Sequence, residues 1–155
     1  MQPFQTPTSI QQVRRILASY QRWIGQELLP GALKLPDAQL AEAVFNAPRA
    51  ILSHGTQADP VLNYGNAFTL KLWEYQWEEL TSTPSRLTAE PMERTERQHF
   101  LEQVTKNGFV ADYRGIRISK SGKRFWIENA IVWNLVDECG EKLGQAATFE
   151  KWTAL

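Results

Sequence analysis

Hydrophobic and polar residues alternate most regularly in the last third of the chain, residues 109–152. Successive side chains of a β-strand point to opposite faces, so this alternation is typical of strands that are buried on one side. Turns that contain glycine divide the region into three expected strands, 110–119, 123–136 and 143–152. We therefore expect consecutive antiparallel strands joined by turns.

The middle strand has the strongest pattern. Its apolar residues of one parity are Phe125, Ile127, Ile131, Trp133 and Leu135. Asn129 has the same parity, and a polar group on a buried face needs a hydrogen-bond partner, which is backbone, water or a bound molecule. The sequence therefore predicts one apolar face that contains a single amide.

A helical stripe of apolar residues lies near the start of the chain. A helix is expected from Thr8 or Ser9 to about Leu29, followed by Pro30. Its apolar positions are Ile10, Val13, Ile16, Leu17, Tyr20, Trp23, Ile24 and Leu28. Such a stripe packs on the protein's own sheet or forms a dimer interface, and both interpretations stay open.

Shorter elements are expected between these two regions. They are helices at 37–45, 67–75 and 93–106, strands at 49–54 and 61–64, and helical turns with loop at 76–91. With the C-terminal strands this gives an α+β fold with a sheet of about five strands. We divide the chain into an N-terminal helical region, residues 1–46, and a domain that contains the sheet, residues 47–155.

Charge and composition narrow the classes of function. Lys and Arg number 17, as do Asp and Glu, so the net charge is zero and gives no general argument for nucleic-acid binding. No apolar run approaches the about 18 residues that span a bilayer, and the start lacks a signal-peptide pattern. The single Cys139 fits a reducing compartment. We expect a cytoplasmic protein with no membrane or direct nucleic-acid partner.

Residue types that perform catalysis are sparse. The two histidines and one cysteine do not have metal-ligand spacing, and the sequence has no glycine-rich phosphate loop. We expect no catalysis. The enzymatic alternative is a small isomerase or hydratase with a curved sheet, which needs a buried acid or base in its cavity. Asp112 and Glu128 are its nearest candidates.

Several segments resemble the MEKHLA domain family, which is PAS-like. They are Asp59-Pro60, Asn63 to Asn66, Pro84 to Pro91, Arg94 and Arg97, Tyr113 to Ser119, Val132 to Leu135, and Gly144 to Ala147. The resemblance implies a PAS-like five-stranded antiparallel sheet covered by helices, and a sensory or regulatory role. The string that names the family is absent, as are a basic region and a leucine zipper, so the DNA-binding role of plant members is not expected.

The resemblance also raises the question of cofactors. Some PAS domains bind haem through a histidine on the helix before the long hairpin, but His99 groups with the polar side of that helix. Covalent flavin binding needs a cysteine in the middle of the fold, whereas Cys139 lies at an expected turn. The sequence therefore argues against haem and covalent flavin. His54 shares parity with Leu52 and is expected to face inward.

A PAS-like cavity would lie between the sheet and the covering helices. An apolar cavity with a few amides suits a small organic molecule, and the length of the turn at Cys139 decides whether Asn129 and Gln145 share a face. The expected ligand-binding residues are Asn129, Gln145, Trp133, Ile131, Phe125, Trp73, Phe100 and Tyr113. In the alternative, a ligand-free scaffold, side chains fill this core.

A basic cluster lies near the first C-terminal turn. Its members are Tyr113, Arg114, Arg117, Lys123 and Arg124. It protects a sheet edge from aggregation or docks an acidic partner or an anion, and both interpretations stay open. The working hypothesis is a sensory domain that binds a small molecule or a regulatory protein. Ligand binding would change the packing of the N-terminal helix and, with it, formation of a homodimer.

Overall fold

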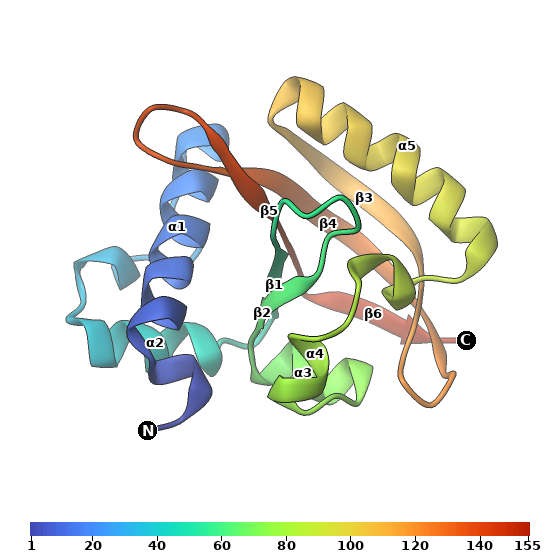
Figure 1. The fold of residues 1–155 in the computed structure, drawn as a ribbon, viewed down its shortest axis with the longest axis horizontal. Helices are drawn as coiled ribbons and strands as arrows, with labels where there is room; N and C mark the ends of the chain where they lie inside the picture. Colours follow the sequence, from blue (N-terminus) through green and yellow to red (C-terminus); the bar gives the residue numbers. More distant parts are fainter.

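The computed structural model describes the backbone of residues 1–155 and the side chains of residues 1–90 and 94–155. An antiparallel sheet lies between two groups of helices (Figure 1). Its strands follow the order β2-β1-β5-β4-β3, and β6 pairs with the first half of β4. The expected α+β fold is confirmed, with β6 as a sixth strand. Among the described residues, no helix has both the length and the hydropathy needed to cross a bilayer.

The elements follow the predicted order. The strands are β1 (Ala50–His54), β2 (Leu62–Gly65), β3 (Phe109–Ile118), β4 (Arg124–Val136), β5 (Lys142–Phe149) and β6 (Lys151–Ala154). The helices are α1 (Pro7–Ile24), α2 (Asp37–Phe45), α3 (Ala67–Trp73), α4 (Trp77–Leu80) and α5 (Pro91–Asn107), with short 3-10 turns η1 (Pro3–Gln5), η2 (Ala32–Lys34) and η3 (Ser85–Thr88). The first helix ends earlier than predicted, because Gly25 adopts a φ of 80° and caps it.

The helices α1 and α2 cover one face of the sheet (Figure 1). Ile16 and Tyr20 of α1 pack against Trp133 of β4, and the Trp133 Nε1–H donates to the Ile16 carbonyl oxygen at 3.2 Å. The Tyr20 and Trp133 rings meet edge to face at 5.0 Å. The apolar stripe of the first helix therefore packs on the protein's own sheet, which leaves that stripe unavailable as a dimer interface.

The helices α3, α4 and α5 cover the opposite face. Trp73, at the end of α3, packs edge to face on Phe125 and Phe149, with ring centroids 5.0 and 5.9 Å apart. On α5, Phe100 packs against Tyr113 of β3, with ring centroids 4.1 Å apart and the planes tilted by 48°. The two groups of helices thus form separate hydrophobic cores on the two faces.

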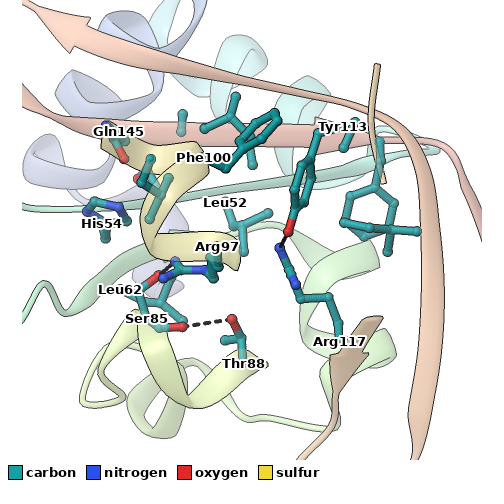
Figure 2. Close-up of a pocket in the computed structure, with 18 of the residues that line it drawn as sticks. Leu52, His54, Leu62, Ser85, Thr88, Arg97, Phe100, Tyr113, Arg117 and Gln145 are labelled. Carbon is teal, nitrogen blue, oxygen red and sulfur yellow. Dashed lines mark hydrogen bonds between the residues drawn. The ribbon is translucent and has the colours of Figure 1, made fainter. Parts of the chain in front are cut away.

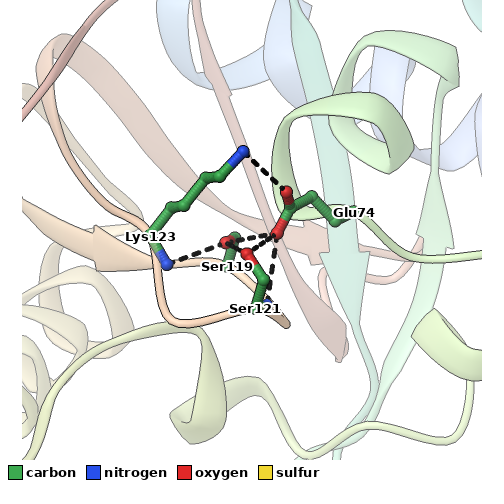
Figure 3. Close-up of polar contacts among 4 residues, drawn as sticks. All are labelled: Glu74, Ser119, Ser121 and Lys123. Atoms are coloured by element: carbon green, nitrogen blue, oxygen red, sulfur yellow. Dashed lines mark hydrogen bonds and ion pairs between the residues drawn. The ribbon is translucent and has the colours of Figure 1, made fainter.

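Glu74 holds the β3–β4 turn against the end of α3 (Figure 3). Its carboxylate accepts hydrogen bonds from the Ser119 hydroxyl at 2.7 Å and from the hydroxyl and backbone N–H of Ser121, and it pairs with the Lys123 ammonium at 3.4 Å. These bonds, led by the two hydroxyls, lower the pKa of Glu74 to about 2.

Buried Asn66 joins the two halves of the molecule. Its side-chain oxygen accepts from the backbone N–H groups of Ile51 and Thr69, and therefore caps α3. Its amide donates to the carbonyl oxygens of Val44, at the end of α2, and Arg49, before β1. The fully buried amide thus has several partners, as a buried polar group requires.

A β-bulge corrects the predicted face of β4. Tyr113 pairs with Ala130 but Gly115 pairs with Ile127, so β4 has two residues, Glu128 and Asn129, where β3 has one. Asn129 adopts a φ of 53° and is exposed. The extra residue shifts the alternation by one, so side chains of the same parity before and after the bulge point to opposite faces of the sheet. Phe125 and Ile127 therefore face α3–α5, whereas Ile131, Trp133 and Leu135 face α1, so the single apolar face predicted for these five residues is wrong.

Candidate ligand-binding cavity

A cavity of about 70 Å³ lies between the sheet and α5 (Figure 2). Strands β1, β3, β4 and β5 form its floor, while α3, η3 and α5 cover it. Most of its wall is apolar and includes Leu52, Trp73, Phe100, Ile127 and Phe149. An enclosed apolar space with a few polar groups is the usual form of a small-molecule site.

Two arginines form one end of the cavity. Arg97, on α5, donates to the Ser85 hydroxyl, and Arg117, on β3, donates to the Tyr113 hydroxyl (Figure 2). Arg117 is 6% exposed and its guanidinium lies 5.1 Å from the centre of the Tyr113 ring. A Cβ atom on Gly115 would come within 2.8 Å of the Tyr113 hydroxyl, so glycine leaves the room that this pair needs.

The charge of this end is positive. No Asp or Glu is among the described residues that line the cavity. Burial, together with the like charge of Arg117, lowers the pKa of Arg97 to about 10. Arg97 therefore keeps its positive charge near pH 7.

Gln145 of β5 lies at the other end and connects the cavity to both groups of helices. Its amide donates to the Asn134 side-chain oxygen at 3.1 Å, and the Asn134 amide donates to the Val104 carbonyl oxygen of α5 at 3.0 Å. The Asn134 carbonyl oxygen accepts from the Trp23 indole N–H of α1 at 2.9 Å. Hydrogen bonds through Asn134 therefore link Gln145 to α5 and to α1.

Two polar atoms of the wall have no hydrogen-bond partner among the described residues, His54 Nε2 and Trp73 Nε1. The His54 Nδ1–H donates to the Gly55 carbonyl oxygen at 2.8 Å, which leaves Nε2 as an acceptor. Burial lowers the pKa of His54 and the charges of Arg97 and Lys142 add to this, while the hydrogen bond to Gly55 and the nearby Gln145 side chain oppose it. The cavity thus presents one unused acceptor and one unused donor. A third such atom, the Tyr64 hydroxyl oxygen, belongs to the core under α1.

The structure brings together four of the eight predicted ligand-binding residues, Gln145, Trp73, Phe100 and Tyr113. Phe125 lies behind Trp73 and lines a surface groove with Trp152 instead. Ile131 and Trp133 face α1, and Asn129 is exposed at the bulge. The predicted inward position of Asn129 is therefore wrong, and Asn134 is the amide opposite Gln145.

Sequence reasoning missed Arg97, Ser85 and Thr88 as cavity residues and placed Arg117 in an exposed cluster. Tyr113 of that cluster also lines the cavity, whereas the other three residues lie outside: Arg114 lies over Trp126 at 5.0 Å, and Lys123 and Arg124 pair with carboxylates. Tyr113 and Arg117 are four residues apart on one strand, so their side chains are expected on the same face. The sequence therefore contains a signal that places Arg117 with Tyr113. His54 faces inward as predicted, and His99 is exposed on α5.

Comparison with known proteins decides the family. The sequence model of the MEKHLA domain matches residues 10–154, nearly the whole chain. The chain belongs to the MEKHLA domain family. The match includes α1 as well as the sheet. No curated protein matches significantly.

Solved structures share the fold of this MEKHLA domain. A PAS domain from Colwellia psychrerythraea superposes with a TM-score of 0.64 at 18% identity, over 76% of this chain and 95% of that one. A light-oxygen-voltage domain studied with a flavin analogue gives 0.60 at 16% identity, over 76% and 84%. The PAS domain of a LuxR-family transcriptional regulator from Burkholderia thailandensis, in complex with ethanol, gives 0.55 at 17% identity, over 74% and 95%. The predicted PAS-like fold is confirmed.

The residues present do not fit a flavin or a haem. The cavity of about 70 Å³ is several times smaller than the about 300 Å³ at which pockets for larger organic ligands begin. Cys139 is exposed on the β4–β5 loop, away from the residues that line the cavity. Asp112 and Glu128, the candidates of the enzymatic alternative, are both exposed. The described residues contain no cluster of His, Cys, Asp or Glu that would hold a metal ion.

Proposed function

We propose that this MEKHLA domain is a sensory or regulatory module that binds a small molecule in the cavity under α5. The observation that carries the proposal is the pair of unused polar atoms on the cavity wall, His54 Nε2 and Trp73 Nε1. Buried polar atoms without a partner are costly. A ligand whose polar group lies beside either atom would supply the partner that this atom lacks.

The response to the ligand would pass through Gln145 and Asn134. Asn134 contacts α5 with its side chain and Trp23 of α1 with its backbone. A ligand that bonds to Gln145 with a different affinity in two packing arrangements would shift the balance between them. The changed surface would be the outer face of α1 or α5, where a regulatory protein could dock.

The volume of the cavity favours a small molecule as the ligand. The cavity holds only a few non-hydrogen atoms beyond the side chains that line it. The Burkholderia thailandensis PAS domain in complex with ethanol offers a precedent within the same fold for a very small guest.

Native mass spectrometry of the protein purified from its own cells tests this proposal. We expect a retained small molecule whose loss on denaturation accounts for the mass difference. Gln145→Leu should abolish retention, while Asn129→Gly, which keeps the bulge conformation and lies outside the cavity, should preserve it. Protein that carries no molecule, and whose melting temperature no small molecule raises, would instead support the ligand-free scaffold.

A further inference from the structure

The two arginines of the cavity have little access to water. Arg117 is buried and Arg97 is partly buried. Among the side chains that the structure describes, neither forms an ion pair with a carboxylate, whereas six basic residues at the surface or partly buried do: Arg14, Arg49, Arg86, Lys120, Lys123 and Arg124. The other nine basic residues also have no ion pair among the described residues, but most of these nine are exposed.

The hydrogen bonds of these arginines go only to neutral acceptors. Arg97 donates to the Ser85 hydroxyl, and Arg117 donates to the Tyr113 hydroxyl and to the Ile116 carbonyl oxygen. A guanidinium group has five N–H donors, so both side chains retain donors. A buried cation without a counter-ion is unfavourable, and two neighbouring cations repel each other. A stable fold does not need this arrangement, whereas an anion site does.

We propose that the cavity binds a small organic acid, with its carboxylate at Arg97 and Arg117 and its apolar part against Trp73, Phe100 and Phe149. This inference rests on the proposed function and specifies the chemical class of the ligand. A guanidinium fork matches a carboxylate with two parallel hydrogen bonds. An inorganic anion would fill the arginine end but would leave the apolar wall without contact.

A second hollow adjoins the cavity at the same arginine. It is a surface depression of about 240 Å³ between α5 and the β1–β2 loop. Its wall shares His54, Ser85, Arg97, Leu101 and Gln145 with the cavity, and it is also lined by Asp59 and Glu102. Arg97 and Leu101 of α5 therefore line both hollows.

Calorimetric titration with acetate and butyrate, each compared with its neutral amide, tests the inference. Acetamide and butyramide have nearly the same shape but no charge. We expect each acid to bind at least about tenfold more tightly than its amide, since hydrogen bonds between charged groups are the stronger kind. Arg97→Met and Arg117→Met should each weaken binding of the acid at least about tenfold.

Lys106→Met is the matched control, because it removes one positive charge from the exposed side of the same helix. It should leave binding unchanged. Arg97→Met should also raise the melting temperature of the ligand-free protein by roughly 2–4 °C, since it removes a cation without a counter-ion. Arg117→Lys keeps the charge and provides a second test if loss of the Tyr113 contact in Arg117→Met impairs folding.

Equal binding of acid and amide, or equal behaviour of Arg97→Met and Lys106→Met, would overturn the inference. If the amides bind and Gln145→Leu abolishes their binding, the sensory proposal stands and only the acidic ligand is wrong. If neither acids nor amides bind and the native protein retains no molecule, both proposals fail.

Discussion

The two faces of the sheet are covered to a similar extent but are packed differently. Under α1 and α2, Trp133 is fully buried and its indole N–H is bonded to Ile16. Under α3–α5, the Trp73 indole N–H has no partner among the described residues, and an open space remains beside it. A tryptophan thus fills the core on one face of the sheet, and another tryptophan lines a cavity on the opposite face.

Charge separates the faces in the same way. The described core under α1 and α2 is formed by apolar and aromatic side chains, whereas the other face contains two arginines, His54 and Gln145. Buried charge reduces stability, so its presence on the α5 face of the described residues indicates a purpose other than folding. We interpret the α1 face as the stabilising face and the α5 face as the binding face.

The largest expected effect comes from Trp133→Ala. Removing a fully buried tryptophan should reduce the free energy of unfolding by about 3–5 kcal/mol. Phe100→Ala, on the edge of the cavity, should cost only about 1–2 kcal/mol, because Phe100 is partly exposed and borders existing space. Urea denaturation measures both values. Equal costs would show that the two faces do not differ in packing.

A smaller, pH-dependent effect is expected from Glu74→Gln. The hydrogen bonds of Glu74 lower its pKa from 4.5 to about 2, so they stabilise the fold above pH 4.5 and are lost as the pH falls towards 2. Thermal unfolding between pH 2 and 7 should show a steeper loss of stability for the wild type than for the variant. Glu78→Gln, which changes an exposed carboxylate on α4, should keep the wild-type slope.

The smallest expected effect is that of His54→Gln. Burial lowers the pKa of His54 below its ordinary 6.5, so as the pH falls the unfolded chain takes up a proton before the folded one does. The wild type should therefore lose stability as the pH falls below about 6.5, and the variant should lose less. His99→Gln, at an exposed position on α5, serves as the control in the same melts. An identical slope for His54→Gln and wild type would contradict the buried, neutral histidine.

The order of elements could be predicted from the sequence because it depends on local patterns. The apolar stripe of the first helix, the alternation in β3–β5 and the capping Asn66 are each visible within a few residues. The bulge in β4 was not predicted, although the adjacent polar residues Glu128 and Asn129 in an apolar strand are a sign of it. Asn is among the few residue types that tolerate a positive φ.

The cavity was harder to predict because its wall combines residues of β1–β5 with residues of α3, η3 and α5. The covered face of a PAS-like fold predicts four of the cavity residues, Gln145, Trp73, Phe100 and Tyr113. It does not predict Arg97 and Arg117, because arginine is rarely buried and a sequence pattern assigns it to the surface. Only the packing of α5 over β3 shows that both enter the same space.

The tryptophan indole signals in a two-dimensional ¹⁵N–¹H NMR spectrum test the central claim most directly. Titration with butyrate should shift the Trp73 indole signal, because Trp73 lines the cavity. It should leave the Trp133 signal in place, because that N–H is bonded to Ile16 under α1. A shift of Trp133 equal to or larger than that of Trp73 would contradict the assignment of binding to the α5 face.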